Sequence, residues 1–282
     1  MKFGLAVSGR AEPARLERMA VLADDLGYDS FLVTDHFMLP DSNNHIDVWS
    51  FLPYLAAKTS HIRLGTCVTP IPFRQPAILA KFISSVDNLS NGRVILGAGF
   101  GWFKPEFDGY SKWYETKERI AFTEEAIQLM QLLWTKNEGA VNFQGKYLRS
   151  EGAVIEPKPV QKPHPPIWFG GHLSQSLRMA GEYGQGWMPI GPRWFDESYP
   201  KPDQYSIMKN KIVEKLRRRK DITEQKFVFT ILINSTDLTK LRRDIEDYIQ
   251  SGMNYFTLGE KAKSDDSLRT IETVAKEIGH SL

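Results

Sequence analysis

The chain has 282 residues, of which 41% are hydrophobic and 25% charged, and this composition is typical of a soluble globular protein rather than a disordered one. Lysine and arginine number 36 against 34 aspartate and glutamate, and the net charge of +2 argues against a protein built to bind nucleic-acid phosphates. A single cysteine, Cys67, excludes an intrachain disulfide, and since no signal-peptide or membrane-span pattern occurs we expect a cytoplasmic protein without a membrane partner.

The hydrophobic period switches repeatedly between the value of two that strands show and the value of 3.6 that helices show. In chain order, strands are expected at residues 2–7, 28–34, 62–69, 93–97, 167–170, 187–190, 227–233 and 255–258. Helices are expected at residues 14–26, 48–59, 76–89, 117–134, 174–183, 204–219, 241–249 and 268–278. This alternation indicates a parallel sheet with right-handed crossovers. The length of the chain and the eight strand–helix units favour a (β/α)₈ barrel over an open sheet.

The helix expected at 76–89 has the clearest pattern. It begins at Pro76, which suits the first helical position. Its apolar residues form one stripe that we expect to face the core: Ile78, Leu79, Phe82, Ile83 and Val86.

One stretch does not fit a bare barrel. Residues 141–149 (VNFQGKYLR) predict a hairpin that turns at Gln144-Gly145, and the proline-rich run at 156–166 can form neither a helix interior nor a central strand. We therefore expect residues 1–282 to form one barrel domain with an insertion at about 139–166. A flexible linker between two domains is the alternative.

Candidate chemistry lies where barrel strands end, because catalytic groups in such barrels come from the C-terminal ends of strands. Asp35 and His36 follow the second strand, and an imidazole beside a carboxylate can transfer protons near neutral pH, although a structural histidine is the alternative. Cys67 and Val68 end the third strand. A lone cysteine in an apolar strand is more typical of a small buried side chain than of a nucleophile.

The next two strand ends are rich in glycine. Gly97 and Gly99 leave exposed backbone N–H groups and room for a ring, although glycine spacing alone is a weak signal. Glu106 beyond them is a candidate acid or base on a loop, with a surface residue as the alternative. Gly170 and Gly171 precede a helix whose N-terminus can bind an anion, with Ser174 as the N-cap or a phosphate ligand.

Aromatic residues are frequent, and several of them at one barrel mouth would form an apolar pocket for a planar ring system. The tryptophans concerned are Trp49, Trp102, Trp113, Trp168, Trp187 and Trp194. No pair of histidines has the spacing of metal ligands on a helix, so we expect no metal site and disfavour a metal-dependent hydrolase.

Longer motifs run through the chain. Residues 64–107 contain Arg-x-Pro, Leu-Ala, Asp-x-Leu-Ser-x-Gly-Arg and Leu-Gly-x-Gly-x-Gly-Trp, and residues 169–189 contain Gly-Gly-His, an Ala-Gly helix and Gly-Gln-Gly-Trp. With Asp35-His36 added, the chain resembles the luciferase-like monooxygenase family of flavin- and deazaflavin-dependent oxidoreductases over nearly its whole length. The resemblance implies a (β/α)₈ barrel whose mouth binds coenzyme F420 or FMN.

The resemblance also implies roles for residues. His36 lies at the active centre with Asp35 beside it, and a non-proline cis peptide at Cys67-Val68 bulges against the cofactor ring. Glu106 flanks the substrate side.

The same resemblance implies that Gly170, Gly171 and Ser174 contact the polar tail of the cofactor. Family members often have a small polar residue followed by proline after the Gly-Gly pair, where this chain has His172-Leu173, and a displaced Ser174 without a phosphate contact is the alternative.

We therefore expect an oxidoreductase that transfers a hydride between coenzyme F420 and a small organic substrate. An FMN-dependent monooxygenase of the same family and a non-catalytic ligand-binding barrel are the alternatives. We expect a homodimer, because cyclic dimers are the commonest oligomers and members of the family usually self-associate.

Overall fold

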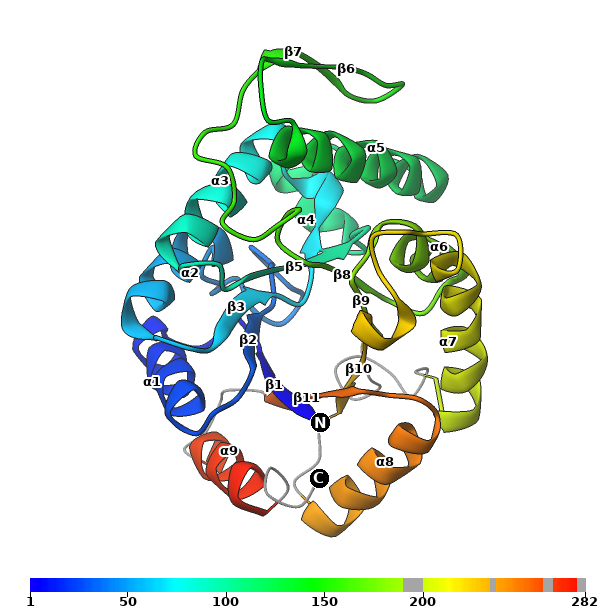
Figure 1. The fold of residues 1–282 in the computed structure, drawn as a ribbon. Helices are drawn as coiled ribbons and strands as arrows, with labels where there is room; N and C mark the ends of the chain where they lie inside the picture. Colours follow the sequence, from blue (N-terminus) through cyan, green and yellow to red (C-terminus); the bar gives the residue numbers. More distant parts are fainter. Residues whose placement is uncertain (190–199, 234–236, 261–265, 278–282) are drawn as a thin grey trace.

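Parallel strands close into a barrel in the computed structural model, which describes residues 1–189, 200–233, 237–260 and 266–277 (Figure 1). Within these ranges eight strands form the ring, and β3 pairs with β5 while β11 returns to β1. In order round the ring they are β1 (Lys2–Val7), β2 (Ser30–Val33), β3 (Arg63–Thr66), β5 (Val94–Gly99), β8 (Ile167–Gly170), β9 (Gly186–Met188), β10 (Val228–Ile233) and β11 (Tyr255–Glu260). A short strand, β4 (Thr69–Pro70), pairs with β5. The predicted (β/α)₈ barrel is confirmed.

Helices surround the ring (Figure 1). They are α1 (Pro13–Asp25), α2 (Val48–Lys58), α3 (Pro76–Leu89), α4 (Lys104–Tyr110), α5 (Thr116–Thr135), α6 (Ser174–Tyr183), α7 (Pro202–Leu216), α8 (Leu238–Gln250) and α9 (Asp266–Glu277). Short 3₁₀ turns occur at Ile71–Phe73 and Glu224–Lys226. The helix α4 was expected as a loop, because seven residues are too few to show a helical period. The ends of two expected elements, at residues 190 and 278, and Trp194 lie outside the described residues.

The core has two layers, one between the helices and the strands and one inside the barrel. The N-terminal end of the interior is filled by Arg63, whose guanidinium lies 5.3 Å from the ring centroid of Trp168 and forms an ion pair with Asp29. Because this end of the interior is filled, a ligand can reach the interior only from the end where the strands finish.

The expected insertion contains the hairpin of β6 (Val141–Gln144) and β7 (Arg149–Ala153), which projects beyond α5 outside the ring (Figure 1). Its turn takes in residues 145–148 and is longer than the predicted Gln144-Gly145 turn. The reason lies in α5, where the carboxylate of Glu125 accepts hydrogen bonds from the backbone N–H groups of Lys146, Tyr147 and Leu148 at 2.8, 2.8 and 3.0 Å.

Two charged residues of the Asp-x-Leu-Ser-x-Gly-Arg motif hold the fold together. The buried carboxylate of Asp87 accepts hydrogen bonds from the backbone and side chain of Gln161 at 3.0 and 2.7 Å, which fixes the proline-rich run on α3. The guanidinium of Arg93 donates to the carbonyls of Ala56, Ile62 and Ser90 at 2.9, 2.9 and 2.8 Å. This part of the motif is therefore structural.

The stripe expected along α3 is partly wrong. Leu79, Ile83 and Val86 are buried, whereas Ile78 and Phe82 are 58% and 51% exposed. The neighbours of α3 are α2 and α5, and they cover a narrower face of the helix than its apolar residues occupy. An apolar surface is left on the outside of the barrel.

We expect Arg93→Lys to lower the free energy of unfolding by about 2–3 kcal/mol, because an ammonium group cannot replace a planar fork that donates to several carbonyls. Urea denaturation measures this difference. Arg149→Lys is the matched control, since Arg149 lies on the exposed hairpin and pairs with the exposed Glu151, and it should change the value by less than about 0.5 kcal/mol. Equal effects of the two substitutions would contradict the role given to Arg93.

Candidate functional site

The predicted catalytic pair is brought together at the C-terminal end of the barrel. His36 lies in the loop after β2, and Glu106 lies in α4, which follows β5. The Nδ1 atom of His36 is 3.1 Å from the Oε2 atom of Glu106, with the two side chains 14% and 1% exposed. Residues 70 positions apart thus form one hydrogen-bonded unit at the mouth of the barrel.

The other carboxylate oxygen of Glu106 binds the backbone next to His36. It accepts hydrogen bonds from the N–H groups of Phe37 at 2.5 Å and Met38 at 3.3 Å. Burial alone would raise the pKa of Glu106, but the hydrogen bond and charge of His36 and the two backbone N–H groups outweigh it, so the pKa lies below its ordinary value of 4.5. Glu106 is therefore a carboxylate at neutral pH. It fixes the proton of His36 on Nδ1 and leaves Nε2 for other partners.

Asp35, beside His36, is turned away into a buried network. Its carboxylate accepts hydrogen bonds from the guanidinium of Arg74 at 2.6 and 3.0 Å and from the hydroxyl of Thr69 at 2.8 Å. The same guanidinium also binds Asp47 at 2.6 Å, and its centre lies 5.2 Å from the centroid of the Phe37 ring. Both chain neighbours of His36 are thus anchored. Direct contact of Asp35 with a cofactor stays a prediction.

The sequence did not single out Arg74 or Thr69 as site residues. A signal for Arg74 existed, because it opens the Arg-x-Pro motif that immediately precedes α3. For Thr69 no comparable pattern was present.

The end of β3 forms an apolar bulge. The Cys67-Val68 peptide bond is cis, as the resemblance implied. A Cβ atom added to Gly97, Gly99 or Gly170 would lie 3.2, 2.6 or 2.8 Å from a methyl group of Val68. Gly97 and Gly99, which the sequence marked as room for a ring, and Gly170, which it placed at an anion site, therefore form a cradle for the Val68 side chain. Gly97 also admits the backbone carbonyl of Thr66, with which an added Cβ atom would clash. Cys67 is a buried thiol, as expected, and burial raises its pKa to about 12.

The N-terminus of α6 has no side-chain cap. The prediction that Ser174 is the N-cap is wrong, because the helix begins at Ser174 and the N-cap is Leu173, which cannot accept a hydrogen bond with its side chain. Ser174 is exposed, and its hydroxyl donates to Gln175 at 2.9 Å. Gly171 has a φ of +90°, which favours glycine, and so the chain turns there between β8 and α6. The first turn of α6 keeps N–H groups that no side chain caps, and such groups can bind an anion.

The tryptophans divide between the core and the mouth. The indole ring of Trp102 is half exposed, and its centroid lies 6.0 Å from that of His36. Trp49, Trp168 and Trp187 are buried in the core. A second imidazole, that of His45, packs edge-to-face against His36 with the ring centroids 6.2 Å apart. No sequence pattern pointed to His45.

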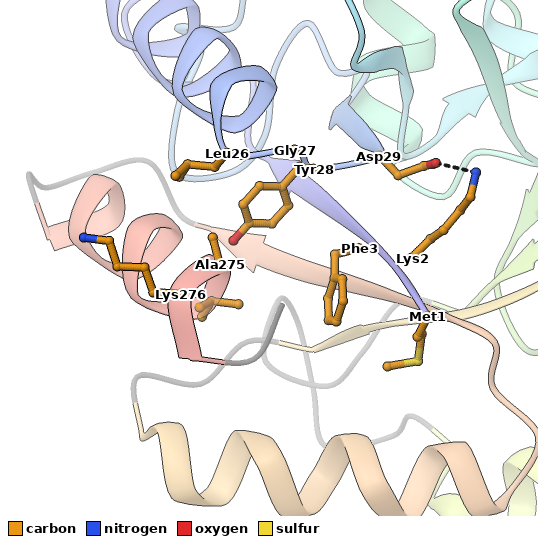
Figure 2. A pocket seen from close by; sticks show the side chains of 10 residues that line it. Met1, Lys2, Phe3, Leu26, Gly27, Tyr28, Asp29, Ala275 and Lys276 are labelled. Atoms are coloured by element: carbon orange, nitrogen blue, oxygen red, sulfur yellow. Dashed lines mark ion pairs between the residues drawn. The ribbon is translucent and has the colours of Figure 1, made fainter. Parts of the chain in front are cut away.

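A pocket of about 410 Å³ lies at the opposite end of the barrel (Figure 2). It is lined by the start of β1, the loop before β2 and the end of α9, and the ion pair between Lys2 and Asp29 at 2.7 Å forms one wall. Because it lies where the strands begin, it is separate from the candidate site.

The described residues contain neither a cluster of metal ligands nor a membrane-spanning helix. Within residues 1–189, 200–233, 237–260 and 266–277, no group of three or more histidine, cysteine, aspartate or glutamate side chains is arranged to hold a metal ion. No helix in those ranges has both the length and the apolar character needed to cross a bilayer.

Two relatives that match this chain by sequence share one name. The chain is 35% identical over 195 residues to F420-dependent glucose-6-phosphate dehydrogenase from Gordonia bronchialis, which is 67% of this chain and 56% of the relative. It is 36% identical over 181 residues to the enzyme of that name from Nocardia farcinica, covering 62% and 53%. The chain thus matches little more than half the length of these relatives.

Solved structures share the fold. An F420-dependent secondary alcohol dehydrogenase, solved with an F420-acetone adduct, has a TM-score of 0.84 at 22% identity, with 98% and 97% of the two chains covered. The monooxygenase RslO1 from Streptomyces bottropensis has a TM-score of 0.78 at 20% identity and covers both chains fully, at 100%. The family model described as luciferase-like monooxygenase matches residues 1–279. The barrel, the strand-end site and these matches agree, and the chain belongs to the luciferase-like monooxygenase family.

Proposed function

We propose that this protein is an oxidoreductase that transfers a hydride between coenzyme F420 and a small organic substrate. The observation that carries the proposal is the hydrogen bond of His36 to the buried Glu106, next to the Val68 bulge at the barrel mouth. F420 is preferred to FMN because the relatives by sequence are named for it. FMN is the alternative cofactor, as the monooxygenase among the structural neighbours suggests.

The residues at the mouth fit such a cofactor. Val68, held in its glycine cradle, offers an apolar surface for a ring with Gly97 and Gly99 behind it. Gly170, Gly171 and Ser174 lie where the uncapped amides of α6 suit the anionic tail, and Asp35 acts through its anchoring of His36. When bound, F420 supplies a two-electron acceptor for hydride.

His36 and Glu106 then handle the proton. As the carbon of an alcohol loses hydride, its hydroxyl proton passes to the Nε2 atom of His36, which is free to accept it because Nδ1 already donates to Glu106. The carboxylate stabilises the imidazolium that forms. The partly exposed edge of the ring returns the proton to solvent.

The proposal also covers the domain organisation, the cellular location and the oligomeric state. We propose that residues 1–282 form one barrel domain with the insertion at about 139–166, that the protein is cytoplasmic, and that it is a homodimer. The exposed apolar side chains of α3 support a dimer, because exposed apolar side chains gathered on one helix mark an interface. They are Ile78, Phe82 and Leu89, which are 58%, 51% and 69% exposed.

We expect His36→Asn to lower turnover of oxidised F420 with propan-2-ol or glucose 6-phosphate by about 100-fold or more, because the proton acceptor is lost. Absorbance of the cofactor measures turnover, and fluorescence titration should show its affinity unchanged within about twofold. His61→Asn, at an exposed histidine before β3, is the control and should keep full activity. A wild-type protein that binds F420 but turns over neither substrate would favour the non-catalytic barrel.

We expect Glu106→Gln to lower kcat about 100-fold, because an amide no longer fixes the proton of His36 on Nδ1. The pKa of Glu106 is lowered in the folded protein, so its contribution to stability is fully present above pH 4.5 and is lost as pH falls through the folded pKa. The difference in free energy of unfolding between wild type and variant should thus be largest at neutral pH and shrink below pH 4.5. A difference that grows in acid would speak against an ionised Glu106.

We expect Phe82→Glu to convert a dimer to a monomer, because it places a charge among the exposed apolar side chains of α3. Light scattering after gel filtration measures the mass. Ile207→Glu is the control, since Ile207 is 59% exposed on α7 and the variant should stay dimeric. A monomeric wild-type protein, or loss of the dimer in both variants, would overturn this interface.

A further inference from the structure

The loops after β1 and β2 are joined next to His36. The carbonyl of Gly9 accepts a hydrogen bond from the N–H of Ile46 at 3.2 Å, and the N–H of Gly9 donates to the hydroxyl of Thr34 at 3.0 Å. These bonds bring together the neighbours of Gly9 and Ile46 in the chain, which are Arg10 and His45. The pair lies at the mouth of the barrel, where the ring of His45 packs edge-to-face against that of His36.

Both side chains carry buried polar atoms without partners. The Nε atom of Arg10 and both ring nitrogens of His45 have no hydrogen-bond partner within the part of the chain that the structure describes. Buried polar groups in proteins are nearly always paired, because an unpaired one is unfavourable. Three such atoms beside a proposed catalytic histidine are typical of a site that a ligand completes.

The charges of this pair favour a neutral ligand. Arg10 already forms an ion pair with Asp41. Burial, with the charges of His36 and Arg10, lowers the pKa of His45 to about 4, so its ring is neutral at physiological pH. The unpaired atoms then comprise the N–H donors of Arg10 and His45 and one acceptor nitrogen. A hydroxyl group, which both donates and accepts, is the complement of this set, whereas a phosphate offers no proton at that pH.

The distance to His36 sets where this hydroxyl lies on the substrate. The ring centroids of His45 and His36 are 6.2 Å apart, which is close enough for two oxygens on neighbouring carbons of one small molecule to reach one ring each. We propose that Arg10 and His45 bind a second hydroxyl group of the substrate, next to the carbon that loses hydride, and so select neutral vicinal diols. The inference rests on the proposed function for the place of the reacting carbon.

The test compares binding of propane-1,2-diol with that of propan-2-ol, which lacks the second hydroxyl. Dissociation constants are measured by NMR titration of the protein alone and with reduced F420, conditions under which neither alcohol is oxidised. Wild type should bind the diol about tenfold more tightly, and His45→Phe, which keeps a ring without nitrogens, should remove the preference. Arg10→Lys keeps the charge but loses Nε, and should reduce the preference about threefold. His61→Phe is the control and should preserve it.

Equal affinities of wild type for the two alcohols, or a preference that survives both His45→Phe and Arg10→Lys, overturns the inference. If His45 had only a structural role, His45→Phe would weaken the binding of both alcohols alike and leave the ratio of their dissociation constants unchanged. Failure of the proposed function is seen in a separate assay with oxidised F420, as a cofactor absorbance that neither alcohol changes. In that case the ratio of the two dissociation constants still tests whether Arg10 and His45 bind the second hydroxyl group.

Discussion

The carboxylate of Glu106 is the constraint on which the candidate site depends. One of its oxygens binds the ring of His36 and the other binds the backbone of Phe37 and Met38, so a single buried group fixes both a side chain and the loop that carries it. On the other side of His36, Asp35 is fixed by Arg74. A histidine held from both sides keeps one orientation and one protonated nitrogen, which is what proton transfer at a defined atom requires.

Much of the fold was predictable because barrel units repeat a simple pattern. Each strand is a short apolar run and each helix an apolar stripe, and the helix at 76–89 was placed to the residue. The misses have local causes. The helix α4 is too short for a period, and the hairpin turn is set by Glu125 of a distant helix. Ile78 and Phe82 follow the stripe of α3, although no described element covers them.

The site was predictable only in part. The resemblance pointed to His36, Glu106 and the Cys67-Val68 bond, and the first two proved to be hydrogen-bonded partners. Gly97 and Gly99 were predicted to leave room for a ring, but their immediate role differs, since Gly99 makes room for Val68 and Gly97 for Val68 and the carbonyl of Thr66. Arg10 and His45 could not be found from sequence, because their proximity arises from one backbone hydrogen bond between two loops.

These features describe a barrel that is filled at one end and offers, at the other, an apolar bulge, uncapped helix amides and an oriented imidazole. The most direct test of this account is a fluorescence titration of the purified protein with F420, compared with the same titration with FMN. The account predicts saturable binding of F420 at micromolar concentration and much weaker binding of FMN. Tight binding of FMN with oxygen consumption, and no binding of F420, would contradict it.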